Sequence, residues 1–189
     1  MNCINITKNP NIKNIEKYFD FYTIKLKPYV VQFATQNLDG MHGINTHTNA
    51  VVFRGIDYAL SLDKNPLPVV FACAFHDMAR THDMIDSEHG KYALPMATKI
   101  MKTMPIFFDK DTEGKILDAV ANHTSGVVAP DYISACLWDA DRTRLAWQYG
   151  FNPKYFNTER GKYVAGGDAW KYIEFQRKNF PEFTWDREY

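Results

Sequence analysis

The chain has 189 residues, 46% hydrophobic and 23% charged, which are ordinary values for a globular protein that buries a substantial core. Its 22 basic and 22 acidic residues give a formal net charge of zero, so the overall charge does not favour a nucleic acid or a membrane surface as a partner. The odd number of cysteines, Cys3, Cys73 and Cys136, without metal-ligand spacing predicts free thiols in a reducing compartment. No apolar run is long enough for a bilayer and the polar start lacks a signal-peptide apolar region, so we expect a cytoplasmic location.

Helical periodicity dominates the chain and strand-like alternation is scarce, so we expect an all-α fold. A glycine-flanked turn over 39–43 precedes the second predicted helix, and Pro66 and Pro68 are expected to separate the second from the third. Residues 152–167, which contain three glycines, are predicted to form a long connection. The predicted helices run over about 15–36 (kinked or broken at Pro28), 47–62, 69–79, 89–101, 109–123, 132–149 and 168–178. These give a helical bundle of about six to seven helices in a single domain, 1–189, with a core over about 42–147 and a C-terminal extension over about 151–189.

His76 and Asp77 stand at the end of the most apolar predicted helix. Helical steps of three and four place His76 over Ala72 and Val69, and Asp77 over Cys73. A charged carboxylate on an apolar face is unfavourable unless it is paired or bound to a metal. The alternative is a hydrogen-bonded His–Asp pair that only stabilises the core.

Four more polar residues lie on inward faces of predicted helices. Each of them alone would most simply be a buried structural group. Together with His76 and Asp77 they form a set of imidazoles and carboxylates on five helices, which suits zinc, iron, manganese, nickel or cobalt. These four residues are His47, His89, His123 and Asp141.

Two of these assignments have competitors nearby. Asp139 and Asp141 point to nearly opposite faces of one predicted helix, and Asp141 shares the more apolar row. His42 lies in the glycine-flanked turn, whereas His47 begins a periodic helix. We prefer Asp141 and His47, and we expect His42 to line the mouth of the site or to orient a ligand.

The order His47, His76-Asp77, Asp141 resembles the signature of the HD-domain superfamily of metal-dependent phosphohydrolases. Residues 69–77 are similar to the family's apolar helix that ends in His-Asp, and 138–142 resemble its last Asp-containing helix. His89-Gly90 and His123-Thr124 resemble the two further histidines of the binuclear members. The resemblance covers roughly residues 42–147 and implies a helical bundle of the HD-domain type.

The resemblance implies a pair of divalent metal ions (Mn, Fe, Ni, Co, Zn or Mg). His47, His76, Asp77 and Asp141 would hold the first ion. Asp77 would bridge to a second ion, held by His89 and His123. The nucleophile would be a water molecule activated by the metals, because metal ions lower the pKa of bound water and polarise phosphoryl oxygens.

Charged residues near this set are candidates for catalysis or substrate binding. In the loop 80–88, we expect Asp83 or Asp86 to orient an imidazole or to transfer protons. The predicted catalytic residues are Asp77, Arg80 and Asp83. The alternative is an ordinary solvated loop. The predicted contacts to a substrate phosphate are Arg80, Lys91, Arg142 and Arg144.

The leading functional hypothesis is hydrolysis of a phosphate ester or anhydride, with a small phosphorylated molecule such as a nucleotide as substrate. The same ligands also fit an HD-fold di-iron oxygenase acting on a small alcohol or phosphonate. A third hypothesis is a non-catalytic nucleotide-sensing module. Fold and ligands settle a site better than a reaction, so these alternatives stay open.

Aromatic residues are concentrated toward the C-terminal end of the chain. We interpret Tyr149, Phe151, Tyr155 and Phe156 as core or interface residues. The aromatic tail 175–189 could pack across a homodimer.

Overall fold

The computed structural model describes residues 12–167 and 169–181, and within these residues every regular element is a helix. The fold is therefore all-α, as the periodicity predicts. The α-helices are α1 (Ile12–Phe21), α2 (Lys27–Phe33), α3 (Asn49–Ser61), α4 (Pro66–Phe75), α5 (His89–Thr103), α6 (Lys110–Asn122), α7 (Tyr132–Tyr149), α8 (Glu159–Gly166) and α9 (Ala169–Asn179). Two π-helical turns, η1 (Tyr22–Leu26) and η2 (Ile44–Thr48), and one 3-10 turn, η3 (Pro153–Tyr155), complete the elements.

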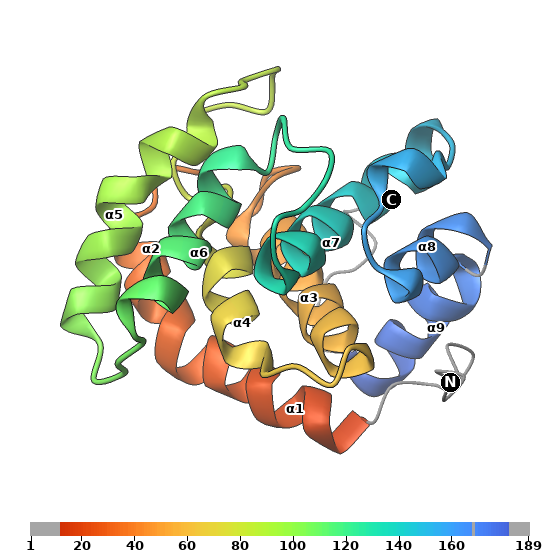
Figure 1. Cartoon of the computed structure of the whole chain (residues 1–189), viewed down its shortest axis with the longest axis horizontal. Coiled ribbons are helices and arrows are strands. Elements are labelled where there is room, and N and C mark those ends of the chain that lie inside the picture. The colour runs from red at the N-terminus through yellow and green to blue at the C-terminus, as the bar shows by residue number, and fades with distance from the viewer. Residues whose placement is uncertain (1–11, 168, 182–189) are drawn as a thin grey trace.

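Helix α4 lies at the centre of the bundle, with α3, α6 and α7 packed around it (Figure 1). All but one of its ten residues are buried, so it is apolar on every side. Helix α5 packs on α6 at one end of the molecule. At the opposite end α8 contacts α7 and α3, and α9 contacts α8.

The third predicted helix is shifted toward its N-terminus in the structure. Pro66 and Pro68 do not precede α4 but form its first turn, where a missing N–H has no intrahelical partner to lose. The side chain of Asn65 caps this turn by accepting from the Leu67 N–H. The helix ends at Phe75, so His76 is its C-cap and Asp77 lies in the following turn.

Helices α6 and α7 match the predicted ranges closely because their boundaries carry strong local signals. Asp109 accepts from the Thr112 N–H at 2.8 Å and caps α6. Asp131 accepts from the backbone of Ile133 and Ser134 and caps α7. Helix α7 ends before Gly150, whose φ of 101° favours glycine.

The first predicted helix is divided and the predicted long connection is not a loop. Residues 12–33 form α1, η1 and α2, with Pro28 in the first turn of α2. Residues 152–167 contain η3 and α8, and Thr158 caps α8 by accepting from the Gly161 N–H at 2.9 Å. These changes give more helical segments than the expected six to seven.

The aromatic C-terminal region is partly folded into the core. Phe180 is buried and its ring centroid lies 4.9 Å from that of Phe53 in α3. This part of the expected dimer surface therefore packs within its own chain. The rest of the expected dimer tail, 182–189, lies outside the described residues.

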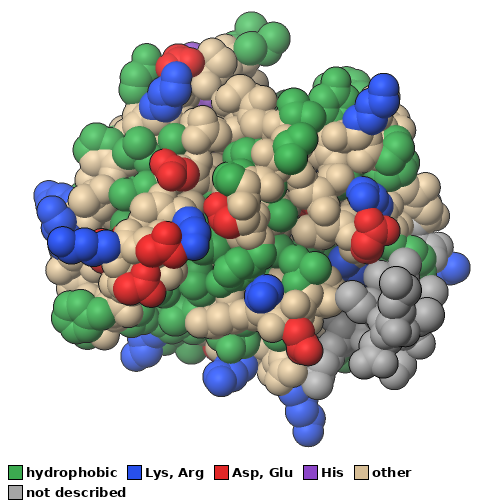
Figure 2. All heavy atoms as spheres, in the orientation of Figure 1, with side chains coloured by type: hydrophobic (Ala, Val, Ile, Leu, Met, Phe, Trp, Pro, Cys, Tyr) green, Lys and Arg blue, Asp and Glu red, His purple; other side chains and the backbone are tan. Residues whose placement is uncertain are grey.

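The face of the molecule in Figure 2 shows basic and acidic side chains interspersed, with no large region of one sign. Only small patches of His surface are visible on this face, although the chain contains six histidines. Among the described residues, no helix combines the length and the apolar character that crossing a membrane requires.

Candidate metal centre

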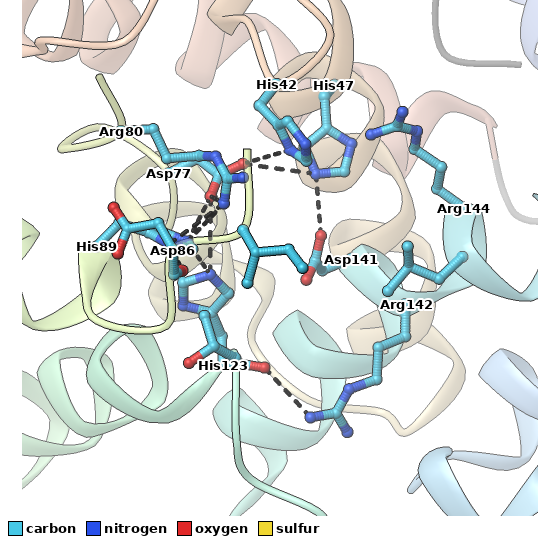
Figure 3. Close-up of a pocket in the computed structure, with 13 residues that line it drawn as sticks. His42, His47, Asp77, Arg80, Asp86, His89, His123, Asp141, Arg142 and Arg144 are labelled. Carbon is cyan, nitrogen blue, oxygen red and sulfur yellow. Dashed lines mark hydrogen bonds and ion pairs between the residues drawn. The ribbon is translucent and has the colours of Figure 1, made fainter. Parts of the chain in front are cut away.

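The structure brings all six predicted ligands together where five segments meet. Figure 3 labels each of them except His76. His47 lies in η2, and His76 and Asp77 follow α4. His89 is the first residue of α5, His123 is the C-cap of α6, and Asp141 lies in α7. All are buried except Asp141, whose side chain is 20% exposed.

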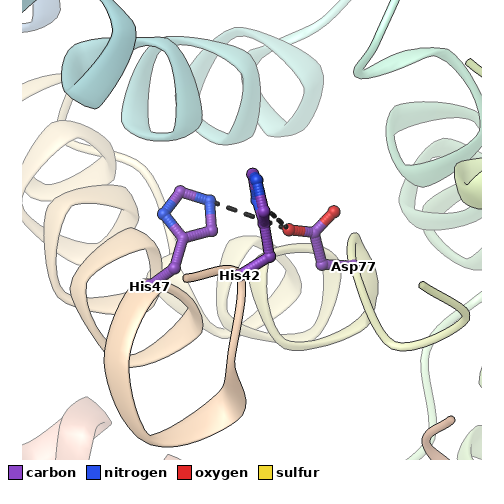
Figure 4. Close-up of side chains that lie close together, drawn as sticks. All are labelled: His42, His47 and Asp77. Carbon is purple, nitrogen blue, oxygen red and sulfur yellow. Dashed lines mark ion pairs between the residues drawn. The ribbon is translucent and has the colours of Figure 1, made fainter. Parts of the chain in front are cut away.

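Asp77 stands between two groups of imidazoles, with one carboxylate oxygen facing each group. Its Oδ1 atom lies 2.8 Å from His89 Nε2 and 3.7 Å from His123 Nε2. Its Oδ2 atom lies 3.3 Å from His42 Nδ1, 3.8 Å from His47 Nε2 and 3.4 Å from His76 Nε2 (Figure 4). A single carboxylate is therefore shared by both groups.

Asp141 closes the group on the Oδ2 side. Its Oδ1 atom lies 2.9 Å from His47 Nε2 and 3.9 Å from His76 Nε2. The donor atoms divide into overlapping triads, each within 4.8 Å, and the two that contain predicted ligands alone are His47–His76–Asp141 and Asp77–His89–His123.

The backbone fixes the orientation of three of the imidazoles. The Nδ1 atoms of His76, His89 and His123 donate to the carbonyl oxygens three residues earlier, at 2.7, 2.5 and 2.7 Å respectively. A neutral imidazole that donates from Nδ1 presents a lone pair on Nε2. The same backbone contact therefore aims three Nε2 lone pairs at the centre of the cluster, as in histidines that bind metals.

Two features of the cluster are consistent with a bound cation. The Nε2 atoms of His89 and His123 lie 2.8 Å apart, although both rings have their Nδ1 atoms on carbonyls. His76 Nε2 is buried and has no hydrogen-bond partner. Buried polar atoms are normally satisfied, so these residues fit a pair of divalent metal ions.

The electrostatics of the cluster keep the carboxylates charged. Burial alone would raise the pKa of Asp77, but the imidazoles of His76, His123 and His42 outweigh it and hold that pKa well below its usual range. Burial would also raise the pKa of Asp141, and the His47 hydrogen bond reverses the direction. Both residues are thus in the acceptor form that a metal ligand needs.

The pKa values of the histidines shift in different directions. Burial lowers the pKa of His123 and of His42, which favours the neutral form that can ligate a metal. Burial would also lower the pKa of His89, but the hydrogen bond of His89 to Asp77 outweighs burial and raises this pKa. In the metal-free protein, His89 is therefore the ring of the close His89–His123 pair that more readily carries a proton.

His42 lies closer to the cluster than the sequence indicates. It is outside the six predicted ligands, yet its Nδ1 atom is 3.3 Å from Asp77 and its ring is 5.4 Å from that of His47. The turn that carries it is held by Gln36, whose Nε2 atom donates to the His42 carbonyl oxygen at 2.5 Å. The flanking glycines were the only local signal for this approach.

Asp139 lies away from the cluster and has a structural environment. Its carboxylate accepts from the backbone N–H groups of Asn157 and Thr158 and from the Thr158 hydroxyl. It therefore fixes the start of α8 on α7, while Asp141, two residues later, faces the imidazoles.

Arg80 and Arg144 provide positive charge beside the cluster. Arg80 is buried, and its Nη1 atom lies 3.9 Å from Asp77 Oδ1 while its Nη2 atom donates to the Met84 carbonyl oxygen at 2.9 Å. Its Nε atom is buried and has no hydrogen-bond partner. Arg144 is also buried, lines the same cavity and points toward His47 (Figure 3).

The other two predicted phosphate contacts have different positions. Arg142 lines the cavity, but its guanidinium points away from the cluster and donates to the carbonyl oxygens of His123, Gly126 and Tyr155 (Figure 3). Lys91 does not line the cavity, because it is exposed on α5 and pairs with Glu88 at 2.7 Å.

Asp83 is also outside the cavity lining, since it is exposed and accepts from the His42 backbone N–H at 3.2 Å. Neither residue lines the cavity, so the roles of Lys91 as a phosphate contact and of Asp83 as a catalytic residue stay predictions without support from their positions. Asp86, the alternative to Asp83, does line the cavity and orients His89 through its carbonyl oxygen.

The cluster opens into a cavity of about 230 Å³. The charged and imidazole groups form one side, and Ile85, Thr124 and Leu145 contribute to the rest. This volume is below the range of drug-sized ligand pockets, so it suits a compact group such as a phosphate and its immediate substituent.

Comparisons with known proteins leave the family open. No protein-family model, no curated protein and no solved structure matches the chain. The resemblance to HD-domain proteins therefore rests on the order and spacing of the residues quoted above.

Proposed function

We propose that the protein is a metal-dependent phosphohydrolase of the HD-domain type that hydrolyses a small phosphorylated compound. The observation that carries this proposal is the position of Asp77, whose two oxygens face separate imidazole groups. Two cations close together need shared negative charge, and a bridging carboxylate supplies it.

The donor set assigns a role to each ligand. His47, His76 and Asp141 would hold one metal ion, His89 and His123 the other, and Asp77 both. A divalent pair in this position would polarise a phosphoryl oxygen and lower the pKa of a water molecule.

Two arginine side chains beside the candidate metal centre favour an anionic substrate. Arg80 lines the cavity and carries a buried N–H without a hydrogen-bond partner, which an anionic oxygen would satisfy. Arg144 adds a second buried positive charge on the other side of the cluster. Two buried guanidinium groups beside paired carboxylates fit a phosphate better than a neutral alcohol.

The test is metal analysis of protein purified without chelator, followed by a phosphatase and phosphodiesterase screen with that metal restored. Two metals per chain and turnover that disappears on chelation would support the proposal. Two irons with an iron-pair spectroscopic signal and no phosphate turnover would replace it with the oxygenase. Metal-independent nucleotide binding without turnover would replace it with the sensing module.

A further inference from the structure

A second cavity adjoins the candidate metal centre. Its volume is about 360 Å³ and it shares two lining residues, Arg142 and Leu145, with the metal-side cavity. The remaining lining residues come from the end of α7 and from the following segment: Ala146, Tyr149, Gly150, Asn152, Tyr155 and Phe156. The two cavities therefore adjoin each other at these two residues.

Helix α7 connects the two cavities along one face. Asp141, Leu145 and Tyr149 are four residues apart, so they follow one side of the helix. Each step advances about 6 Å along the axis. A molecule with its phosphate at Asp141 would thus reach the second cavity with a linker of a few bonds that passes Leu145.

The lining of the second cavity is aromatic and mainly apolar. Phe156 and Ala146 are buried at its base, whereas Tyr149 is 81% exposed and Tyr155 50% exposed at its sides. We interpreted these aromatic residues from the sequence as core or interface. The structure places Phe156 and the partly buried Phe151 in a small core cluster but leaves both tyrosines largely outside it.

Two polar side chains of this cavity are engaged with the backbone. The Arg142 guanidinium donates to three backbone carbonyl oxygens, including that of Tyr155 at 3.1 Å. The Asn152 side-chain oxygen accepts from the Lys154 N–H at 3.1 Å. These bonds hold the walls in place and engage Arg142, the one charged side chain of the described lining, which favours an uncharged group in this cavity.

We propose that this second cavity binds an uncharged aromatic group of the substrate, so that the protein prefers phosphate esters of aryl-alkyl alcohols, with Tyr149, Tyr155 and Phe156 as the specificity-determining residues. This inference rests on the proposed function of the metal centre. A cavity of about 150 Å³ holds benzene in a protein interior, so about 360 Å³ accommodates one ring and its linker. Stacking of a ring on an aromatic side chain gives about a tenfold gain in affinity per contact.

The test compares two phosphonates that cannot be hydrolysed, 3-phenylpropylphosphonate and propylphosphonate, by calorimetry on the full chain supplied with Mn²⁺. We expect the phenyl compound to bind at least about tenfold more tightly. In Tyr149→Ala and Tyr155→Ala, the ratio of the two dissociation constants should fall toward one. The matched control is Tyr92→Ala, which removes an exposed tyrosine of α5 that lines neither cavity. The control should keep the full preference.

The outcomes separate the two proposals. Propylphosphonate binding with no preference for the phenyl compound would overturn the aromatic cavity and leave the phosphohydrolase standing. Tighter binding of a nucleoside phosphonate than of 3-phenylpropylphosphonate would overturn the aryl-alkyl class in favour of a nucleobase. Loss of the preference in the control variant would also count against the cavity. Binding of neither phosphonate would overturn both proposals.

Discussion

The Nε2 atoms of His89 and His123 lie 2.8 Å apart while the Nδ1 atom of each ring contacts a backbone carbonyl oxygen. Two lone pairs at this distance repel unless a proton or a metal ion lies between them or beside them. We therefore expect His89→Ala and His123→Ala each to remove one metal ion per chain and to leave the ion on the Asp141 side. Metal content measured on the purified variants checks this.

The control for both variants is His82→Ala, because His82 is exposed in the same loop as Asp83 and lies outside the cluster. It should retain the metal content of the unchanged protein. Two metals per chain in both cluster variants would show that these rings do not hold the second ion.

The shared carboxylate gives a stricter test of the centre. Asp77→Asn keeps the shape of the side chain but removes the charge that faces both imidazole groups. Because loss of groups that only orient a ligand already costs 10–100-fold, we expect activity to fall by at least about 100-fold and metal content to drop at both positions. Asp83→Asn is the matched control and should retain both metals, because Asp83 is an exposed carboxylate of the loop 80–88 that, among the described residues, hydrogen-bonds only to the His42 backbone N–H. Full activity in Asp77→Asn would refute the bridging role.

Asp139 and Asp141 should separate stability from metal binding. Asp139→Asn weakens the charged hydrogen bonds to Asn157 and Thr158, so we expect the free energy of unfolding to fall by about 2–3 kcal/mol with both metals retained. Asp141→Asn removes the negative charge that faces His47 and should lose one metal. Urea unfolding combined with metal analysis distinguishes them. Loss of a metal in Asp139→Asn, together with a loss of stability alone in Asp141→Asn, would exchange the two assignments.

The same pair shows how far the sequence could predict the site. Helical rows separated Asp141 from Asp139 because α7 is long and regular, with strong signals at both ends. Helix α8 was missed because it has eight residues and is fixed by Asp139, which lies 18 residues or more away in the chain. The position of His42 was missed for a related reason, since its approach to Asp77 depends on a contact across 35 residues that no local pattern encodes.

The two described cysteines should be unreactive in the folded protein. Cys73 and Cys136 are buried free thiols, and burial raises the pKa of both. Because the thiolate is the nucleophile, alkylation at pH 8 should be at least about 100-fold slower in the folded than in the urea-unfolded protein. A Cys3→Ser background removes the one cysteine outside the described residues. Rapid labelling of Cys73 in the absence of urea, detected by mass spectrometry, would contradict its burial.

The backbone of Gly90 lies close to the metal centre, because α5 begins against the end of α6. A Cβ atom at Gly90 would overlap the Val120 carbonyl oxygen, which orients His123, and would lie 2.9 Å from His123 Nδ1. We expect Gly90→Ala to lower the free energy of unfolding by about 1–3 kcal/mol and to weaken metal binding. Gly114→Ala is the matched control, since a Cβ there meets no atom within 4 Å. In the interior of α6 it should stabilise the protein by about 0.5–1 kcal/mol. Urea unfolding checks the opposite signs, and a neutral Gly90→Ala with unchanged metal affinity would mean that α5 and α6 can separate there without moving His123.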